Sequence, residues 1–263
     1  MLYLCAAKGD RIVDKVPKFP DQVQLSMIIT SIPVESITAE QIIDTCLSMN
    51  SLGINQGTSG NVSVRVRDSI GEAIAITPSG LDYEDLTPEK LCKIYFGKDK
   101  EPVFPKNNSY LPSSEWRFHY DILLNRTDVN AIVHTHSIHA TALACMGIAI
   151  PSFHYMVART GGSSIKVADY ATFGTQELSN NALKALGNSL ACLLKNHGMI
   201  ACGKDLSHAL KVAQELETLA QMYIKILSVN KIYGEPQLLS EEEMDIVIEK
   251  FKTYGVQPNI GHG

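Results

Sequence analysis

The segment from Ala131 to His139 constrains the fold of this chain more than any other. Ile132 and Val133 are branched apolar residues, which favour a buried, extended strand. Because side chains two positions apart on a strand point to the same face, His134 and His136 can converge on one ion. On a helix the same pair would lie on nearly opposite sides. The pattern therefore predicts half of a metal site, although two histidines that merely end a strand also fit the spacing.

The overall composition limits the kind of partner this chain can have. With 263 residues, 45% of them hydrophobic and 19% charged, it is an ordinary globular protein with ample material for a core. The formal net charge of −5 and the lack of a basic run argue against a nucleic-acid surface. No stretch approaches the roughly 20 apolar residues of a membrane span, and no signal peptide is recognisable. We therefore expect neither a nucleic-acid nor a membrane partner.

The cysteines indicate a reducing compartment. The sequence has six of them, widely scattered and without a Cys-x-x-Cys pair, and several lie inside apolar runs where a free thiol behaves as a small hydrophobic group. Buried free thiols are therefore expected in place of disulfides or metal ligands, in a cytoplasmic protein. The cysteines are Cys5, Cys46, Cys92, Cys145, Cys192 and Cys202.

Hydrophobic periodicity predicts one α/β domain over residues 37–263, preceded by an extension over residues 1–36 that prolines interrupt. Thr38 and Gln41 have the spacing of a capping box at the start of the first helix. Helices are expected over residues 38–52, from about 113, over 137–146, 178–186, 207–229 and 241–250. Strands are expected over residues 62–66, 73–76, 91–96, at the His-x-His segment, over 151–157 and over 189–194.

His197 is the natural third metal ligand. It follows a second apolar strand, and Gly198 comes next, where the backbone could need an unusual conformation. Three histidines with one open position form a catalytic zinc arrangement more often than a structural one. Considered alone, His197 would more often be a hydrogen-bonded loop histidine, so the assignment depends on its pairing with the His-x-His segment.

Glu115, expected in the first turn of a helix after two serines, is the candidate proton-transfer group. A carboxylate near a metal-bound ketone can take a proton because the cation stabilises the resulting enolate. Simple complementarity with the helix dipole explains the same position without any catalytic role.

Three short segments rich in glycine and hydroxyl side chains could bind a phosphate through hydroxyls and backbone N–H groups: residues 57–61, 79–80 and 113–114. Each is also an ordinary turn or loop when taken alone. No Walker or Gly-x-Gly-x-x-Gly motif is present, so a nucleotide is not implied. Tyr155 and Tyr254 remain as possible acids, although most such tyrosines only pack.

Several motifs appear in a fixed order and together resemble the class II aldolase/adducin family, in particular its bacterial branch that acts on L-fuculose 1-phosphate. The likeness extends from about Ile42 to Gly255. The motifs are Asn55 to Arg65, Pro112 to His119, Val133 to His136, His154 to Met156, Tyr170 to Thr175, Asn196 to Gly198 and Glu249 to Gly255.

The resemblance implies a three-layer α/β/α fold with a central, mainly antiparallel sheet, and a C4 homotetramer with active sites between subunits. It implies that His134, His136 and His197 hold one zinc ion per subunit, with Glu115 as acid/base and displaceable fourth ligand. Tyr155 and Phe173 would lie at the subunit interface near the site, and Tyr254 would close over it. The implied phosphate-binding positions are Thr58, Gly60, Asn61, Ser79, Gly80, Ser113 and Ser114.

The activity that the resemblance implies is reversible cleavage of L-fuculose 1-phosphate into dihydroxyacetone phosphate and L-lactaldehyde. Rival activities in the same superfamily are a pentulose-phosphate 4-epimerase and a methylthioribulose-phosphate dehydratase. A non-catalytic, adducin-like interaction domain is a rival of another class, which the intact histidines and Glu115 disfavour. Arg159 stands where the family pattern has a small residue, so it bears on the aldehyde specificity.

Overall fold

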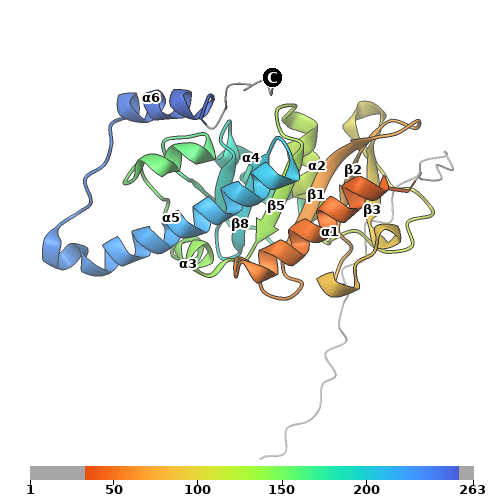
Figure 1. Cartoon of the computed structure of the whole chain (residues 1–263), viewed down its shortest axis with the longest axis horizontal. Helices are drawn as coiled ribbons and strands as arrows, with labels where there is room; N and C mark the ends of the chain where they lie inside the picture. Colours follow the sequence, from red (N-terminus) through yellow and green to blue (C-terminus); the bar gives the residue numbers. More distant parts are fainter. Residues whose placement is uncertain (1–32, 255–263) are drawn as a thin grey trace, which may run out of the picture.

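The predicted His-x-His strand forms the centre of an eight-stranded sheet in the computed structural model, which describes residues 33–254 (Figure 1). The strand order is β4-β3-β2-β1-β5-β8-β7-β6, and every neighbouring pair is antiparallel except β6 and β7. The strands are β1 (Asn61–Arg67), β2 (Glu72–Ile76), β3 (Cys92–Phe96), β4 (Pro102–Val103), β5 (Ala131–Thr135), β6 (Val167–Ala168), β7 (Ala191–Leu194) and β8 (Gly198–Gly203).

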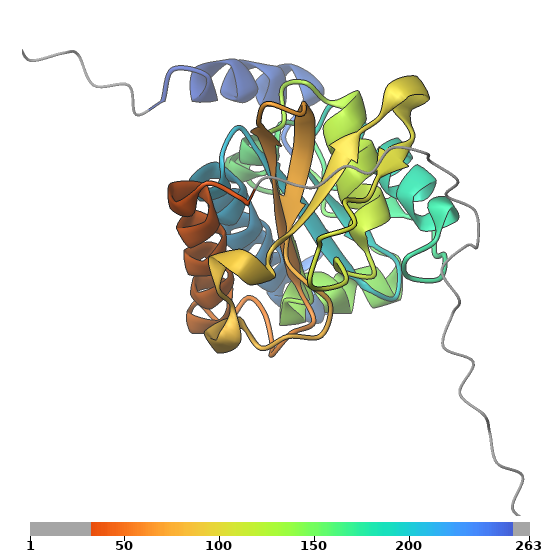
Figure 2. The same ribbon diagram turned by 90° about the vertical axis from the view of Figure 1, so that its right-hand side faces the viewer.

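Helices cover both faces of the sheet, as Figure 2 shows. Alternation along the strands divides the apolar side chains between two cores: Val133 of β5 packs on the side of α1, α3 and α5, and Ile132 on the side of α2 and α4. The predicted three-layer architecture with a mainly antiparallel sheet is therefore confirmed. The helices are α1 (Ser36–Ser51), α2 (Trp116–Asn125), α3 (Ile138–Met146), α4 (Gln176–Leu186), α5 (Leu206–Tyr233) and α6 (Glu241–Phe251).

Some local predictions were wrong. The helix α1 begins at Ser36, with Glu35 as N-cap and no side-chain cap, so Thr38 does not form a capping box. The segment predicted as a strand over residues 151–157 instead leads into a 3-10 helix, η4 (Tyr155–Thr160). The His154 side chain accepts a hydrogen bond from the backbone N–H of Met156, which stabilises the turn conformation over an extended one.

The sequence reasoning also missed β8, which lies beside the central strand β5, and the short edge strands β4 and β6. The apolar run of β7 continues through a tight connection into β8, which pairs with β5 from Ala131↔Gly203 to Thr135↔Met199. Small residues reduce the hydrophobic signal of β8, and the two-residue strands β4 and β6 are too short to show a period. The missed β8 is the strand that brings His197 to the centre of the sheet.

The cysteine prediction holds for most of the described residues. Cys46, Cys92, Cys192 and Cys202 are buried free thiols, whereas Cys145 is free but exposed; Cys5 lies outside the described residues. Most of the predicted extension, residues 1–32, and the tail after Tyr254 also lie outside them. Within residues 33–254, no helix has the length and apolar character needed to cross a membrane.

Candidate metal centre and active site

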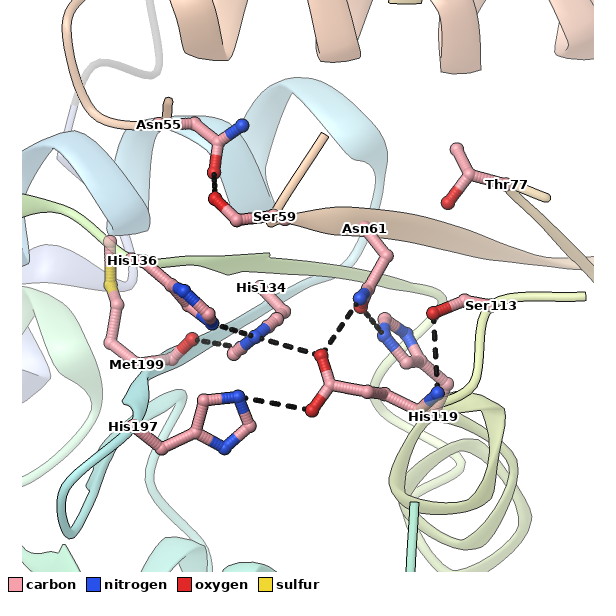
Figure 3. Close-up of polar contacts among 12 residues, drawn as sticks. Asn55, Ser59, Asn61, Thr77, Ser113, His119, His134, His136, His197 and Met199 are labelled. Carbon is pink, nitrogen blue, oxygen red and sulfur yellow. Dashed lines mark hydrogen bonds and ion pairs between the residues drawn. The ribbon is translucent and has the colours of Figure 1, made fainter. Parts of the chain in front are cut away.

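Four predicted site residues converge on one point at the middle of the sheet. Ligand atoms of Glu115, His134, His136 and His197 all lie within 4.8 Å of one another. The Nε2 atom of His134 is 3.1 Å from Nε2 of His136. The two oxygens of Glu115 divide between the other contacts: Oε2 is 3.1 Å from Nε2 of His134, and Oε1 is 3.1 Å from Nε2 of His197 (Figure 3). The cluster could hold a metal ion.

The neighbouring strand sets the orientation of the His134 ring. Nδ1 of His134 lies 2.8 Å from the carbonyl oxygen of Met199 in β8, and a carbonyl can only accept a hydrogen bond (Figure 3). Nδ1 therefore carries a proton, and Nε2 is the nitrogen left to coordinate a metal ion. Metal-ligating histidines are commonly oriented in this way by a backbone carbonyl.

The donor set fits a divalent cation. Oε1 of Glu115 is buried and has no hydrogen-bond partner in the described residues, although it lies beside His197. A buried carboxylate oxygen without a donor is costly unless a cation satisfies it. Three imidazole nitrogens and one carboxylate are a suitable set of ligands for a first-row divalent metal.

Gly198 is needed because of crowding. A Cβ atom at this position would lie 2.5 Å from the carbonyl oxygen of Thr135 and 2.7 Å from Cδ2 of His136. The unusual backbone expected at Gly198 instead occurs at Asn196, whose φ of 56° reverses the chain between β7 and β8. Asn196 makes the turn, and Gly198 lets His197 approach the His-x-His strand.

A carboxylate from α5 supports the segment that follows His136. Glu217 accepts hydrogen bonds from the backbone N–H groups of His139 and Ala140 at 3.0 and 2.9 Å, and its Oε1 is also 2.7 Å from Nδ1 of His139. These N–H groups belong to the first turn of α3, where helical partners are missing. Glu217 therefore fixes the start of α3 directly after the metal cluster.

Glu115 is the N-cap residue of α2, one position before the predicted first turn. Its backbone N–H donates to the hydroxyl of Ser113 at 3.3 Å, and the amide Nδ2 of Asn61 donates to Oε2 at 3.0 Å (Figure 3). The carboxylate points back from the helix into the cluster. Its position is thus set by specific side chains more than by the helix dipole.

The neighbouring charges determine the ionisation of the cluster. Burial alone would raise the pKa of the Glu115 carboxyl, but His134 and His197 outweigh burial and hold this pKa well below its usual range. Burial, together with the charges of His134 and His197, lowers the pKa of His136 to about 4, against an opposing effect of Glu115. Near neutral pH, Glu115 is a carboxylate and His136 is a neutral ring that can act as a ligand.

An open cavity of about 370 Å³ adjoins the cluster, and it brings together several predicted residues from distant parts of the chain. It also includes Ser59 of the predicted segment 57–61, and Tyr170, Ala171 and Asn196, which the sequence reasoning did not assign as site residues. Asn196 and Tyr170 belong to motifs of the family, and these motifs were the sequence feature that could have identified them as site residues. The cavity is lined by Thr58, Ser59, Ser114, Glu115, His136, Tyr170, Ala171, Phe173, Asn196 and His197.

The other predicted phosphate positions lie on connected loops. The backbone N–H of Ser79 donates to Leu111 O at 3.0 Å, and that of Ser113 donates to Thr77 O at 2.9 Å, so these two segments run side by side. Gly80 has a φ of 67°, which favours glycine.

The loop before β1 is fixed by a hydrogen bond within the loop and by close packing against β5. Ser59 donates from its hydroxyl to Oδ1 of Asn55 at 3.3 Å (Figure 3). A Cβ atom at Gly60 would lie 2.5 Å from the His134 carbonyl oxygen, so only glycine fits there. The side chain of Asn61 differs from the other predicted phosphate contacts, because both its polar atoms bond inside the protein, to Glu115 and His119.

Tyr155 and Tyr254 are not brought to the metal cluster. They line a separate cavity of about 380 Å³ between η4 and α6, together with Arg159 and Phe251. The ring of Phe251 stacks on Tyr155, contacts Tyr254 edge-on, and lies 5.8 Å from the guanidinium carbon of Arg159. The expectation that these tyrosines serve a neighbouring subunit's site stays a prediction.

Comparisons with known proteins agree with this site. The family described as Class II Aldolase and Adducin N-terminal domain matches residues 40–224. L-fuculose phosphate aldolase of Escherichia coli strain K12 is 49% identical over 220 residues, covering 83% of this chain and 96% of the relative. A 5-methylthioribulose-1-phosphate/5-deoxyribulose-1-phosphate aldolase of Rhodospirillum rubrum is 49% identical over 214 residues, covering 81% and 90%. A solved structure of L-fuculose 1-phosphate aldolase superposes with a TM-score of 0.74 at 36% identity, covering 84% and 98%.

The chain therefore belongs to the class II aldolase/adducin family. Within this family it is an aldolase, a lyase that breaks a carbon–carbon bond. Class II aldolases depend on a metal ion, and the cluster of Glu115 and three histidines is the group that could bind it.

The crowding at Gly198 predicts the effect of an added methyl group. Gly198→Ala should push the His-x-His strand away from His197, lower the free energy of unfolding by about 1–3 kcal/mol and weaken metal binding. Urea unfolding and competitive metal titration measure these two effects. Gly162→Ala is the matched control, because its added methyl meets the rotatable hydroxyl of Ser189 instead of backbone. Wild-type metal affinity in Gly198→Ala would contradict this account.

Proposed function

We propose that this protein is a zinc-dependent aldolase that reversibly cleaves L-fuculose 1-phosphate into dihydroxyacetone phosphate and L-lactaldehyde. The observation that carries the proposal is the convergence of three histidine Nε2 atoms around the buried Glu115 carboxylate beside an open cavity. Two relatives at 49% identity are named L-fuculose phosphate aldolase and 5-methylthioribulose-1-phosphate/5-deoxyribulose-1-phosphate aldolase, which supports a phosphorylated sugar as the substrate class.

His134, His136 and His197 would hold the zinc ion. Zinc accepts three histidines with a fourth, displaceable ligand, and Glu115 lies within reach to be that ligand. When bound, the cation would stabilise the negative charge that develops on the ketose oxygen as the carbon–carbon bond breaks. The protein's part is to keep the ligand atoms converged and the carboxylate ionised.

Glu115 would move the proton. In the cleavage direction it delivers a proton to the carbanion carbon of the dihydroxyacetone phosphate half, and in the synthetic direction it removes that proton. In the metal-free protein the neighbouring histidines hold the pKa of this carboxyl well below its usual range, so the resting group is the carboxylate, the form that removes the proton in the synthetic direction. No lysine is required for a Schiff base, which separates this mechanism from that of covalent aldolases.

The phosphate would be anchored beside the cavity, away from the carbon that reacts. Hydroxyls and backbone N–H groups bind phosphate without a net positive charge, which suits an acidic protein. Asn61 would combine this role with its hydrogen bond to Glu115, because its Nδ2 amide carries a second N–H that can donate to the phosphate. The phosphate-binding residues in the proposal are Thr58, Gly60, Asn61, Ser79, Gly80, Ser113 and Ser114.

The aldehyde half would be enclosed by a neighbouring subunit in a cytoplasmic C4 homotetramer. Tyr155 and Tyr254 are 50% and 74% exposed and line a cavity separate from this chain's own cluster, so a second copy could receive them. Tyr155 would protonate or deprotonate the aldehyde oxygen, and Tyr254 would close over the site. Phe173, 58% exposed at the rim of the cavity, would contact the neighbour from the other side.

A second candidate substrate is 5-methylthioribulose 1-phosphate or 5-deoxyribulose 1-phosphate. The relative from Rhodospirillum rubrum, named for both, is as similar in sequence as the relative named for fuculose phosphate. These ketoses share the phosphorylated half and differ in the aldehyde half. Arg159 lies in the cavity with Tyr155 and Tyr254, so it bears on that choice.

A substrate panel distinguishes these activities. We expect purified protein with zinc to release dihydroxyacetone phosphate faster from L-fuculose 1-phosphate than from rhamnulose 1-phosphate, 5-deoxyribulose 1-phosphate or methylthioribulose 1-phosphate. A coupled assay for dihydroxyacetone phosphate measures the rates. Preference for a 5-deoxy or methylthio ketose would replace the proposed substrate but leave the proposed aldolase reaction intact. Epimerisation of ribulose 5-phosphate, or dehydration without release of an aldehyde, would contradict the proposal.

Glu115→Gln tests the proton-transfer role. The amide cannot accept the proton, so exchange of the dihydroxyacetone phosphate α-proton with D2O should fall by about 10²–10⁴-fold, with zinc still held by the three histidines. Proton NMR follows the exchange, and atomic emission gives the zinc content. Glu72→Gln, which alters a carboxylate paired with Arg67 at the edge of β1 and β2, is the control. Exchange that survives in Glu115→Gln would remove Glu115 from its role.

A further inference from the structure

Three buried polar side chains form a continuous hydrogen-bonded chain behind Glu115. The hydroxyl of Ser63 lies 2.7 Å from Nδ1 of His119, and Nε2 of His119 lies 2.5 Å from Oδ1 of Asn61. Nδ2 of Asn61 then reaches Oε2 of Glu115 at 3.0 Å (Figure 3). Ser63 and His119 are completely buried and Asn61 is 4% exposed, so water does not compete for these bonds. The proposed chemistry gives His119 no role of its own.

The carboxylate of Glu115, at the end of this hydrogen-bonded chain, fixes the direction of every hydrogen bond in it. An ionised carboxylate only accepts, so the Asn61 amide must donate to Glu115 through Nδ2 and accept through Oδ1. His119 must therefore carry its proton on Nε2, which leaves Nδ1 to accept from the Ser63 hydroxyl. Only one tautomer of His119 and one orientation of the Asn61 amide satisfy all three bonds.

The environment keeps His119 in the neutral form that this pattern requires. Burial, together with the nearby charge of His134, lowers the pKa of His119 to about 3, against a smaller opposing effect of Glu115. The ring also stacks on Phe118, with ring centroids 4.6 Å apart, which limits its rotation. His119 is therefore a fixed donor–acceptor pair across the pH range in which an enzyme works.

The hydrogen-bonded chain of Ser63, His119 and Asn61 gives the two oxygens of Glu115 different partners. Oε2 accepts the Asn61 amide and faces His134, whereas Oε1 accepts no hydrogen bond and faces His197. If the Asn61 amide turned over, its Oδ1 would face Oε2, and two acceptors would repel each other. The donor on His119 prevents this, because a turned amide would place its NH₂ group against the Nε2 proton of His119.

We propose that His119 is a positioning residue for catalysis: through Asn61 it holds Oε2 of Glu115 and leaves Oε1 as the oxygen that exchanges the substrate proton. This inference rests on the proposed function of Glu115 and adds the atom that reacts and the residue that selects it. Outer hydrogen-bond partners of metal-site residues commonly change activity or metal affinity by about 10–100-fold when they are lost.

Two variants separate positioning from simple filling of space. His119→Phe retains the ring and its stacking on Phe118 but removes both hydrogen bonds, whereas an amide in His119→Gln can still donate to Asn61. With saturating zinc, we expect kcat for α-proton exchange to fall about 10–100-fold in His119→Phe with little change in KM for dihydroxyacetone phosphate. His119→Gln should recover most of this loss. Wild-type kcat in His119→Phe, or equal losses in both variants, would overturn the proposal.

A spectroscopic measurement on the metal-free wild-type protein tests the same chain independently of activity. Long-range ¹H–¹⁵N NMR should show His119 protonated on Nε2 and unprotonated on Nδ1, and it should stay neutral from pH 5 to 8. The opposite tautomer, or a charged ring, would overturn the proposal even if His119→Phe does not fold. If Glu115→Gln retains exchange while His119 has the expected tautomer, it is the proposed function of Glu115 that fails.

Discussion

The buried carboxylate of Glu115 is the constraint on which the rest of the structure depends. An ionised carboxylate in the interior is costly unless charge and hydrogen bonds compensate it. Here the compensation comes from Asn61 at the start of β1, His134 on β5 and His197 in the β7–β8 turn. The strand order places β1 and β8 on either side of β5. This order brings Asn61, His134 and His197 together around Glu115, so the charge balance of the site depends on the topology of the sheet.

The molecule divides the proposed chemistry between two regions. The metal cluster lies at the centre of the sheet, where pairing of β5 with β1 and β8 fixes the position of His134. The aromatic group formed by Tyr155 on η4, Phe251 at the end of α6 and Tyr254 after it lines a separate cavity, and both tyrosines are exposed. In the proposed function, the residues that act on the phosphorylated half of the substrate all belong to one chain. The half that distinguishes aldehydes would depend on assembly of subunits.

The sequence predicted the parts of the fold that have a clear period. The branched residues before His134 predicted β5, and the long amphipathic pattern predicted α5, which ends only a few residues later than expected. The approach of His197 to His134 depends on β8, on the left-handed turn at Asn196 and on crowding at Gly198, none of which has a period. The sequence reasoning proposed His197 as the third ligand from its place at the end of an apolar strand, and the family motifs supported that assignment.

His119 shows most clearly what a sequence cannot reveal. One histidine inside an apolar helix is indistinguishable from a core residue until the structure brings β1 beside α2 and shows both its ring nitrogens in hydrogen bonds. The metal content of the protein tests the central claim most directly. Removal of metal by a chelator should abolish cleavage, and titration should restore activity in full at one zinc ion per chain. Undiminished cleavage by the metal-free protein would contradict the account.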